Sequence, residues 1–213
     1  MLTLPAVLAP QLPSAPAREP VLRVIARRAA RTPGLVAVDD RGYQYTYAQL
    51  WHAAARTRRD LVEAGVEPGD VVAVAAGRGA ELLSAILGIW LSGAACLPVG
   101  PDDSGPLPVA GIRAAVVAPG ARFPGGVPVV PLVEVVAAPT EPPYAPVPDG
   151  DAAALVSRVS RSATIRLTHD DLATLLDRCV ADPRLAAGLI VLEFFLPLVR
   201  GDRLLIAPGR PSE

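Results

Sequence analysis

Histidine and cysteine are scarce in this 213-residue chain, which holds two of each. Two histidines, His52 and His169, are too few for a His-rich metal site. The cysteines, Cys96 and Cys179, have no metal-type spacing, and one isolated pair makes no disulfide framework. Aromatic residues are only 4% of the chain. Alanine, valine and leucine must therefore fill the core, which depends on closely packed backbone elements.

An excess of either charge is also absent, because the net charge is −1 and the pI is about 6.1. Nothing in this balance indicates a nucleic-acid partner or an anionic membrane. Arginines do gather locally, at helical spacing among alanines, and we interpret them as solvated helix faces rather than a phosphate-binding patch. They are Arg27, Arg28 and Arg31, and Arg56, Arg58 and Arg59.

Targeting and membrane segments are not indicated either. Residues 1–20 have no basic start, no long apolar run and five prolines, so we expect a Pro/Ala-rich linker or arm, no secretory signal and a cytoplasmic protein. The uncharged stretch Leu82–Pro101 approaches the length of a membrane span. It is interrupted by small residues and ends in turn residues, which predicts a buried helix followed by a buried strand.

The chain does contain enough apolar residues for one sizeable domain, with 51% hydrophobic residues and a mean hydropathy of +0.38. A capping box of Thr46 and Gln49 predicts the start of a helix that ends at Gly65. Strand–helix–strand alternation predicts an α/β domain with a layered, mainly parallel sheet and flanking helices. Other helices are predicted over 21–31 and 80–91, and strands over 35–39, 43–45, 71–75 and 95–99.

The second half of the chain is less regular. Short strands are predicted over 114–118 and 127–130, and a further strand over 151–159. Asp170 and Asp171 lie in the first turn of a helix predicted from Thr168 to about Cys179, where the helix dipole favours acids. Residues 137–149 form a proline-rich loop, residues 188–199 are strongly apolar, and a last strand is predicted over 203–207.

Two segments carry recognisable motifs. Tyr45–Leu50 has the sequence YTYAQL, and Ala85–Pro101 has the sequence AILGIWLSGAACLPVGP. They resemble the first and second core motifs of nonribosomal peptide synthetase adenylation domains, in the adenylate-forming (AMP-dependent synthetase and ligase) family. The family's first motif ends in Leu-Thr-Tyr-x-Glu-Leu. Its second motif has the form AILGVLKAGGAYVPLDP. The resemblance covers residues 21–101 well, and it implies the fold of the family's N-terminal subdomain rather than an activity.

The family's third motif, of the form TSGSTGRPKGVMVTH, lets a glycine-rich backbone wrap the ATP phosphates and adds a lysine. Counted back from Thr168 and His169, residues 155–167 have the sequence LVSRVSRSATIRL and match the motif's length without a gap. No glycine remains, and Ala163 stands at the lysine position. The resemblance therefore implies a segment that cannot cradle phosphates in the family's way.

The same segment has gained three arginines, Arg158, Arg161 and Arg166. They could form a different anion site built from guanidinium groups. The alternative is a surface strand with exposed arginines, which alternate with apolar residues at positions 156, 159 and 165. We favour the strand.

The later family landmarks are incomplete. Residues 192–207 resemble the family's Trp-Glu…Leu-Leu-x-Gly-Ala-Arg-Leu segment, but the preceding Phe-Asp-x-Ser is absent and the interval from His169 is shorter. The family's amino-acid pocket, ribose-binding aspartate and mobile subdomain with the catalytic lysine would follow Glu213. The expectation is a truncated adenylation-like core over residues 21–213, which lacks the C-terminal half and the small subdomain.

Other constellations are weaker. Ser160, His169 and Asp171 could be written as a triad, but no nucleophile-elbow glycines surround the serine. Cys96 replaces the family's usual aromatic residue in a buried strand and is expected to be an inert, packed thiol. Gly77–Ala80 is an incomplete dinucleotide fingerprint that we interpret as a tight turn. We therefore expect no catalytic, cofactor-binding or metal-ligating residues and no cofactor.

The expected function follows from an intact early fold beside a stripped ATP loop. We expect a catalytically inactive, truncated adenylation-domain homologue in bacterial nonribosomal peptide or antibiotic biosynthesis. It would act through contacts with a synthetase module, carrier protein or tailoring enzyme, or as a homodimer. The first alternative is one half of a split amino-acid-adenylating enzyme completed by a partner chain, and the second is a decayed remnant without function.

Overall fold

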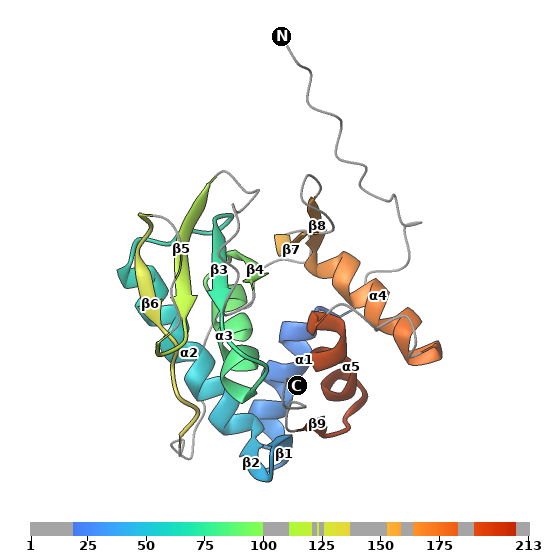
Figure 1. The fold of residues 1–213 in the computed structure, drawn as a ribbon. Helices are drawn as coiled ribbons and strands as arrows, with labels where there is room; N and C mark the ends of the chain where they lie inside the picture. Colours follow the sequence, from blue (N-terminus) through green and yellow to red (C-terminus); the bar gives the residue numbers. More distant parts are fainter. Residues whose placement is uncertain are drawn as a thin grey trace, which may run out of the picture.

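A six-stranded sheet organises most of the chain, and its strand order is β6-β5-β3-β4-β7-β8 (Figure 1). All neighbouring strands are parallel except β7 and β8, which form an antiparallel hairpin. The prediction of a mainly parallel α/β sheet is therefore confirmed. The strands are β3 Val71–Ala75, β4 Ala95–Val99, β5 Ile112–Val117, β6 Val129–Pro131, β7 Ala153–Arg158 and β8 Thr164–Thr168.

The structure is a computed structural model that describes residues 19–99, 111–120, 123, 126–136, 153–158, 164–182 and 190–207. Of the arm expected over residues 1–20, positions 1–18 lie outside the described residues. The proline-rich loop expected over 137–149 lies outside them as well.

Five helices lie in the described part of the chain, and α3 is the central one. All of its residues except Glu81 are buried. It packs against the sheet, α2 and α1, and Trp90 near its end meets Phe195 of α5. A helix that is apolar all round belongs inside a protein. The helices are α1 Val21–Arg31, α2 Tyr47–Glu63, α3 Ala80–Leu91, α4 His169–Ala181 and α5 Ile190–Arg200.

Local signals set the starts of two helices. Thr46 and Gln49 form both hydrogen bonds of a capping box at the start of α2, as predicted. Thr168 and Asp171 form a second capping box at the start of α4. Each box satisfies backbone N–H groups that have no partner inside the helix.

A smaller three-stranded sheet joins two distant parts of the chain. Its order is β2-β1-β9, formed by β1 Val36–Asp40, β2 Tyr43–Thr46 and β9 Leu204–Ile206. Strand β1 pairs with β2 in antiparallel and with β9 in parallel orientation. Residues 204–206 therefore return to the beginning of the fold.

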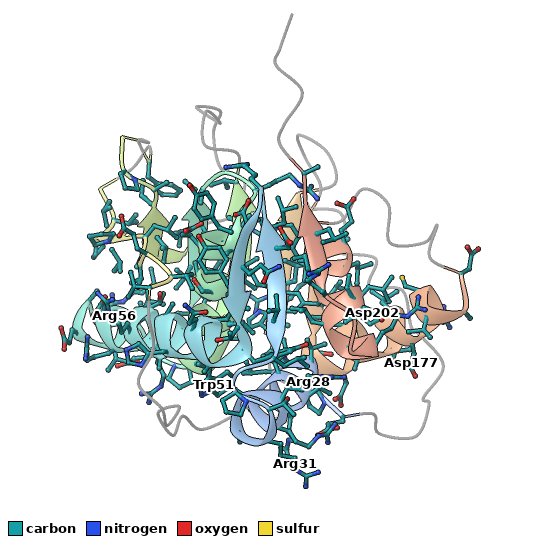
Figure 2. All side chains as sticks on the ribbon, turned by 90° about the horizontal axis from the view of Figure 1, so that it is seen from below. Arg28, Arg31, Trp51, Arg56, Asp177 and Asp202 are labelled. Atoms are coloured by element: carbon teal, nitrogen blue, oxygen red, sulfur yellow. The ribbon has the colours of Figure 1, made fainter. Side chains whose placement is uncertain are left out.

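Helix α5 was not predicted from the sequence. The apolar run over 188–199 contains a single charged residue, Glu193, and Pro197 lies inside the helix. Its last carbonyls are held from outside: Arg28 Nη2 donates to Val199 O at 3.3 Å, and Tyr47 OH donates to Leu198 O at 3.4 Å. Tertiary contacts thus fix the end of this helix. Arg31, on the same helix as Arg28, is exposed and extends away from the fold (Figure 2).

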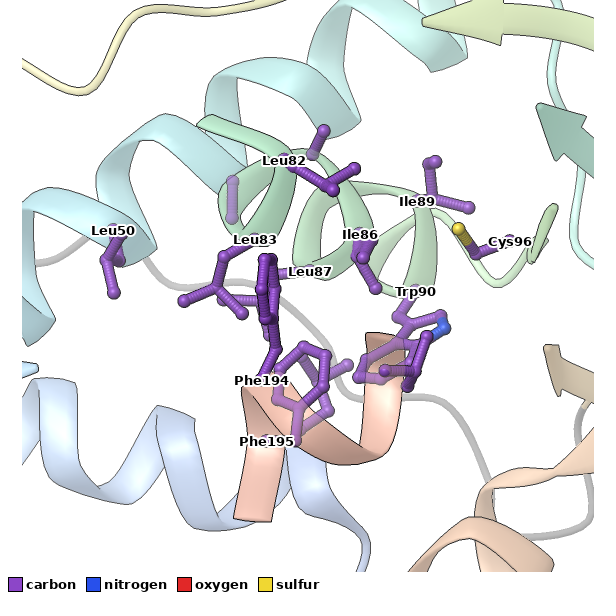
Figure 3. Close-up of a cluster of buried hydrophobic side chains, with 14 of the residues drawn as sticks. Leu50, Leu82, Leu83, Ile86, Leu87, Ile89, Trp90, Cys96, Phe194 and Phe195 are labelled. Atoms are coloured by element: carbon purple, nitrogen blue, oxygen red, sulfur yellow. The ribbon is translucent and has the colours of Figure 1, made fainter. Parts of the chain in front are cut away.

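Gly88 allows α2 and α3 to approach closely. A Cβ added to Gly88 would lie 2.5 Å from Thr57 Cβ and 2.7 Å from Ala54 O. Gly88 belongs to the segment that resembles the family's second motif, so its place in that motif has a packing reason. Figure 3 shows the buried side chains of α3 packed beside Leu50 of α2 and the phenylalanines of α5.

We predict that Gly88→Ala destabilises the protein by about 1–3 kcal/mol, because the new methyl group overpacks the helix contact. In an open helix the same change would stabilise by about 1 kcal/mol. Urea unfolding followed by circular dichroism measures the difference. Gly34→Ala is the matched control, since a Cβ there meets nothing within 4 Å. Equal or higher stability of Gly88→Ala would contradict the close approach.

Candidate functional site

The carboxyl edge of the six-stranded sheet is the candidate site. Open parallel sheets bind ligands outside this edge, where the chain reverses its direction of winding. Strand β3 leads through α3 to β4 on one side, whereas β5 leads to β6 on the other, so the reversal lies between β3 and β5. The turn after β3, Gly77–Gly79, lies at this edge, and the segment 159–163 follows β7, which is parallel to β4.

The β7–β8 hairpin contains residues 155–167, the segment that the sequence resemblance matches to the family's ATP loop. Counted in register from Leu155, the family's glycines fall on Ser157, Ser160 and Thr164. Ser157 pairs with Ile165, and Arg158 pairs with Thr164. Two of the three glycine positions therefore lie in paired, extended strands, while Ser160 lies outside the described residues.

The arginines of the hairpin can be judged only in part. Arg166 is exposed on β8, between the half-buried Ile165 and the buried Leu167. This alternation fits the surface-strand interpretation. The side chains of Arg158 and Arg161 lie outside the described residues, so an anion site that includes them stays untested.

Two helix N-termini that could attract a phosphate already hold carboxylates. Ala80 N, at the start of α3, donates to Asp40 Oδ2 at 3.0 Å, and Asp40 is only 7% exposed. At the start of α4, Asp171 Oδ2 accepts from Thr168 N at 3.0 Å. An anion that approached the N-terminus of α3 or of α4 would therefore meet the negative charge of a carboxylate. The sequence did not reveal the contact of Asp40, because it joins residues 40 positions apart.

The turn after β3 directs its arginine toward α5. Arg78 Nη2 lies 2.5 Å from Glu193 Oε2, and the guanidinium carbon lies 5.3 Å from the Phe194 ring centroid. The Arg78 carbonyl accepts from Arg41 Nη2 at 3.2 Å. These contacts support the interpretation of Gly77–Ala80 as a structural turn.

The histidines are not brought into a catalytic arrangement. His169 is 1% exposed and meets the Trp90 ring edge-on at 5.3 Å, and Asp171 is engaged in its capping box. Ser160 lies outside the described residues, so the structure gives no geometry for a triad of Ser160, His169 and Asp171. His52 lies on α2, far along the chain from His169. No cluster of three metal-ligating side chains occurs within the ranges that the structure describes.

Cys96 is fully buried on β4, and burial raises the pKa of its thiol. Burial, with a contribution from Asp182, also raises the pKa of Cys179. Both thiols stay protonated at neutral pH, which supports the expectation of an inert Cys96. Among the helices in the described part of the chain, none has the length and apolar character that a bilayer crossing needs. The run from Leu82 to Val99 instead forms α3 and β4, as predicted.

Part of the chain matches a known family. Residues 25–116 match the family described as AMP-binding enzyme. An isonitrile lipopeptide synthase from Streptomyces coeruleorubidus is 50% identical over 82 residues, which are 38% of this chain and 6% of that protein. Phosphinothricin tripeptide synthetase PhsB from Streptomyces viridochromogenes is 39% identical over 93 residues, 43% of this chain and 8% of that protein. This chain is a relative of nonribosomal peptide synthetase adenylation domains. It spans less than a tenth of the length of these two relatives.

Solved structures extend the likeness beyond the matched segment. The nonribosomal peptide synthetase FmoA3 aligns with a TM-score of 0.76 and 26% identity, over 94% of this chain and 24% of that chain. The N-terminal subdomain of NpsA from Klebsiella oxytoca aligns with a TM-score of 0.69 and 22% identity, over 92% of this chain and 55% of that chain. The second likeness shows the fold alone. The adenylation-like fold thus continues through α4, α5 and β9.

We predict that the ion pair of Arg78 and Glu193 stabilises the fold and does not serve as a ligand-binding site. In a double-mutant cycle of Arg78→Met and Glu193→Gln, we expect a coupling of about 0.5–1 kcal/mol, because both side chains are partly exposed. Urea unfolding measures the coupling, which should shrink in 1 M salt.

The pair Arg113 and Asp70 is the matched control. Its N–O distance is 3.9 Å and its arginine is similarly exposed, so its coupling should be near zero. A coupling at Arg78–Glu193 no larger than in this control would contradict the structural role.

Proposed function

We propose that this chain is a catalytically inactive adenylation-domain homologue that acts in nonribosomal peptide synthesis through protein contacts. Its adenylation-like core would span residues 21–213 and work in the cytoplasm. The observation that carries the proposal is the β7–β8 hairpin, in which a glycine-free segment replaces the loop that wraps ATP in the family.

The charged residues of the chain support the proposed loss of catalysis. The N-termini of α3 and α4 hold Asp40 and Asp171, which repel an anion. All 20 basic residues of the chain, counting Lys and Arg, are arginines. A lysine for phosphate contact or for the family's catalytic step therefore has no source in this chain. This signal is readable directly from the sequence.

The packing supports a retained role over a decayed remnant. Both capping boxes are complete, α3 is buried on all sides, and Arg28 and Tyr47 hold the end of α5. A remnant free of selection would lose such contacts, because most substitutions destabilise. What is kept is a folded surface, which suits binding to another protein.

A multidomain synthetase supplies the natural partner class. The relatives are peptide synthetases, and one structural neighbour, NpsA-ThdA, is an artificially fused adenylation–PCP di-domain. We infer that a synthetase module or carrier protein is the partner of this chain, with a tailoring enzyme or a second copy as alternatives.

A split enzyme is the second candidate. Under this alternative, this chain would form one part of an adenylation domain, as its alignment with part of FmoA3 allows, and a separate chain would supply the remainder. Such a partner would provide the amino-acid pocket and the lysine. It would not provide glycines at positions 157 and 164 of the hairpin.

The first proposal predicts that the pure protein binds no ATP and catalyses no amino-acid-dependent pyrophosphate exchange. Titration calorimetry with Mg-ATP and exchange assays with the proteinogenic amino acids measure the two activities. A complete adenylation domain from a relative such as PhsB is the positive control. ATP binding or exchange by this chain alone would overturn the proposal.

Exchange activity that arises only when a second chain is added would instead establish the split enzyme. A matched variant sharpens this arm: Ser157→Gly and Thr164→Gly together restore two family glycines within the described hairpin. If these glycines raise the activity of the mixture, the hairpin is the limiting part.

A further inference from the structure

Three aromatic rings meet where α3, α4 and α5 come together. Trp90 of α3 lies 5.3 Å from the His169 ring of α4, edge-on, and 4.7 Å from the Phe195 ring of α5. None of the three is more than 1% exposed. Trp90 Nε1 also donates to Ala154 O of β7 at 2.6 Å. Trp90 thus ties both later helices and the hairpin to the centre of the fold, and Figure 3 shows its ring against Phe195.

His169 is the polar member of this cluster, and it is held uncharged. Its Nδ1 has no hydrogen-bond partner among the described residues. It is the first residue of α4, where the positive end of the helix dipole opposes an imidazolium charge. Burial lowers its pKa from 6.5 to about 4. At neutral pH the ring therefore packs as a neutral aromatic.

The charged groups on the elements around His169 do not stabilise its protonated form, because burial alone accounts for the lowered pKa of the ring. On α4, Asp170 is exposed and Asp171 belongs to the capping box. On α5, Glu193 pairs with Arg78 and Arg200 with Asp202. Asp177 and Arg178 lie farther along α4 and are exposed. Other charged groups are Glu81 at the opposite end of α3, the exposed Arg166 of β8, and Arg28 of α1 beside Val199.

We propose that His169 is an acid-sensitive latch: as a neutral ring it closes α4 and the β7–β8 hairpin onto Trp90, and its protonation releases them. The bonds that hold the rest of the sheet do not involve this ring. Opening should therefore be local, and it would expose the hairpin face and the apolar side of α4. The latch does not depend on the proposed function.

The size of the effect follows from the two pKa values. In the open form the ring titrates near 6.5, and in the closed form near 4. Opening is then unaffected above pH 7 and becomes easier as the pH falls from 6.5 toward 4. At pH 5 the opening equilibrium should rise by about 30-fold over neutral pH.

Hydrogen–deuterium exchange of the full chain at pH 7.5 and pH 5, corrected for intrinsic exchange rates, tests the latch. We expect opening of residues 164–181 to increase by about 30-fold, while β3 and β4 change little. His169→Phe keeps an aromatic ring and removes the proton site, so its exchange should not gain this pH dependence.

Several outcomes would overturn the latch. They are the same pH dependence in His169→Phe as in the wild type, no change at pH 5, or an equal increase in β3 and β4, which would mean global unfolding. If His169→Phe does not fold, His169→Gln carries the same test. NMR titration of the His169 ring in the wild type gives a second readout, because a pKa near 6.5 would remove the physical basis of the latch.

Discussion

The burial of α3 on every side is the constraint on which the remaining structure depends. A helix without a polar face must be covered by the sheet on one side and by other helices elsewhere. Gly88 permits α2 to come close on one flank, and Trp90 meets α5 on another. The arrangement of α1, α4 and α5 follows from the need to cover this helix. The segment that resembles the family's second motif forms the second half of α3 and β4, and the segment that resembles the first motif leads into α2, so both have a structural role in this core.

Some of this could be predicted from the sequence, because the signals are local. The capping box at Thr46, the apolar strand over 71–75 and the helix over 80–91, which is uncharged after Glu81, each lie within a few consecutive residues. The structure of α5 was not predicted, since only Glu193 interrupts its apolar run, it contains Pro197, and its end is fixed by Arg28 from a distant helix. The sequence indicated one surface strand through positions 156–165, whereas the structure has two strands, β7 and β8, whose pairing as a hairpin has no local signal.

The candidate site divides in the same way. The loss of glycines is a local property, and residues 155–167 were enough to predict it. The carboxylate at the N-terminus of α3 was not predictable, because Asp40 reaches Ala80 only after β1 and α3 have been brought together. The protonation state of His169 likewise depends on rings from α3 and α5 that enclose it. Charge states in the interior are consequences of tertiary packing, whereas a missing residue type is visible in the chain itself.

Fold and phosphate chemistry can separate in this family because they rest on different residues. The core needs apolar contacts around α3, and Trp90 of this helix reaches the hairpin through its hydrogen bond to the Ala154 carbonyl of β7. Ser157 and Thr164, which stand at two of the glycine positions, lie in paired strands, where a side chain restricts the backbone more than glycine would. Carboxylates at two helix N-termini then satisfy the N–H groups that an anion would otherwise use. The fold therefore rests on the contacts around α3, whereas phosphate chemistry would rest on the hairpin and the two helix N-termini.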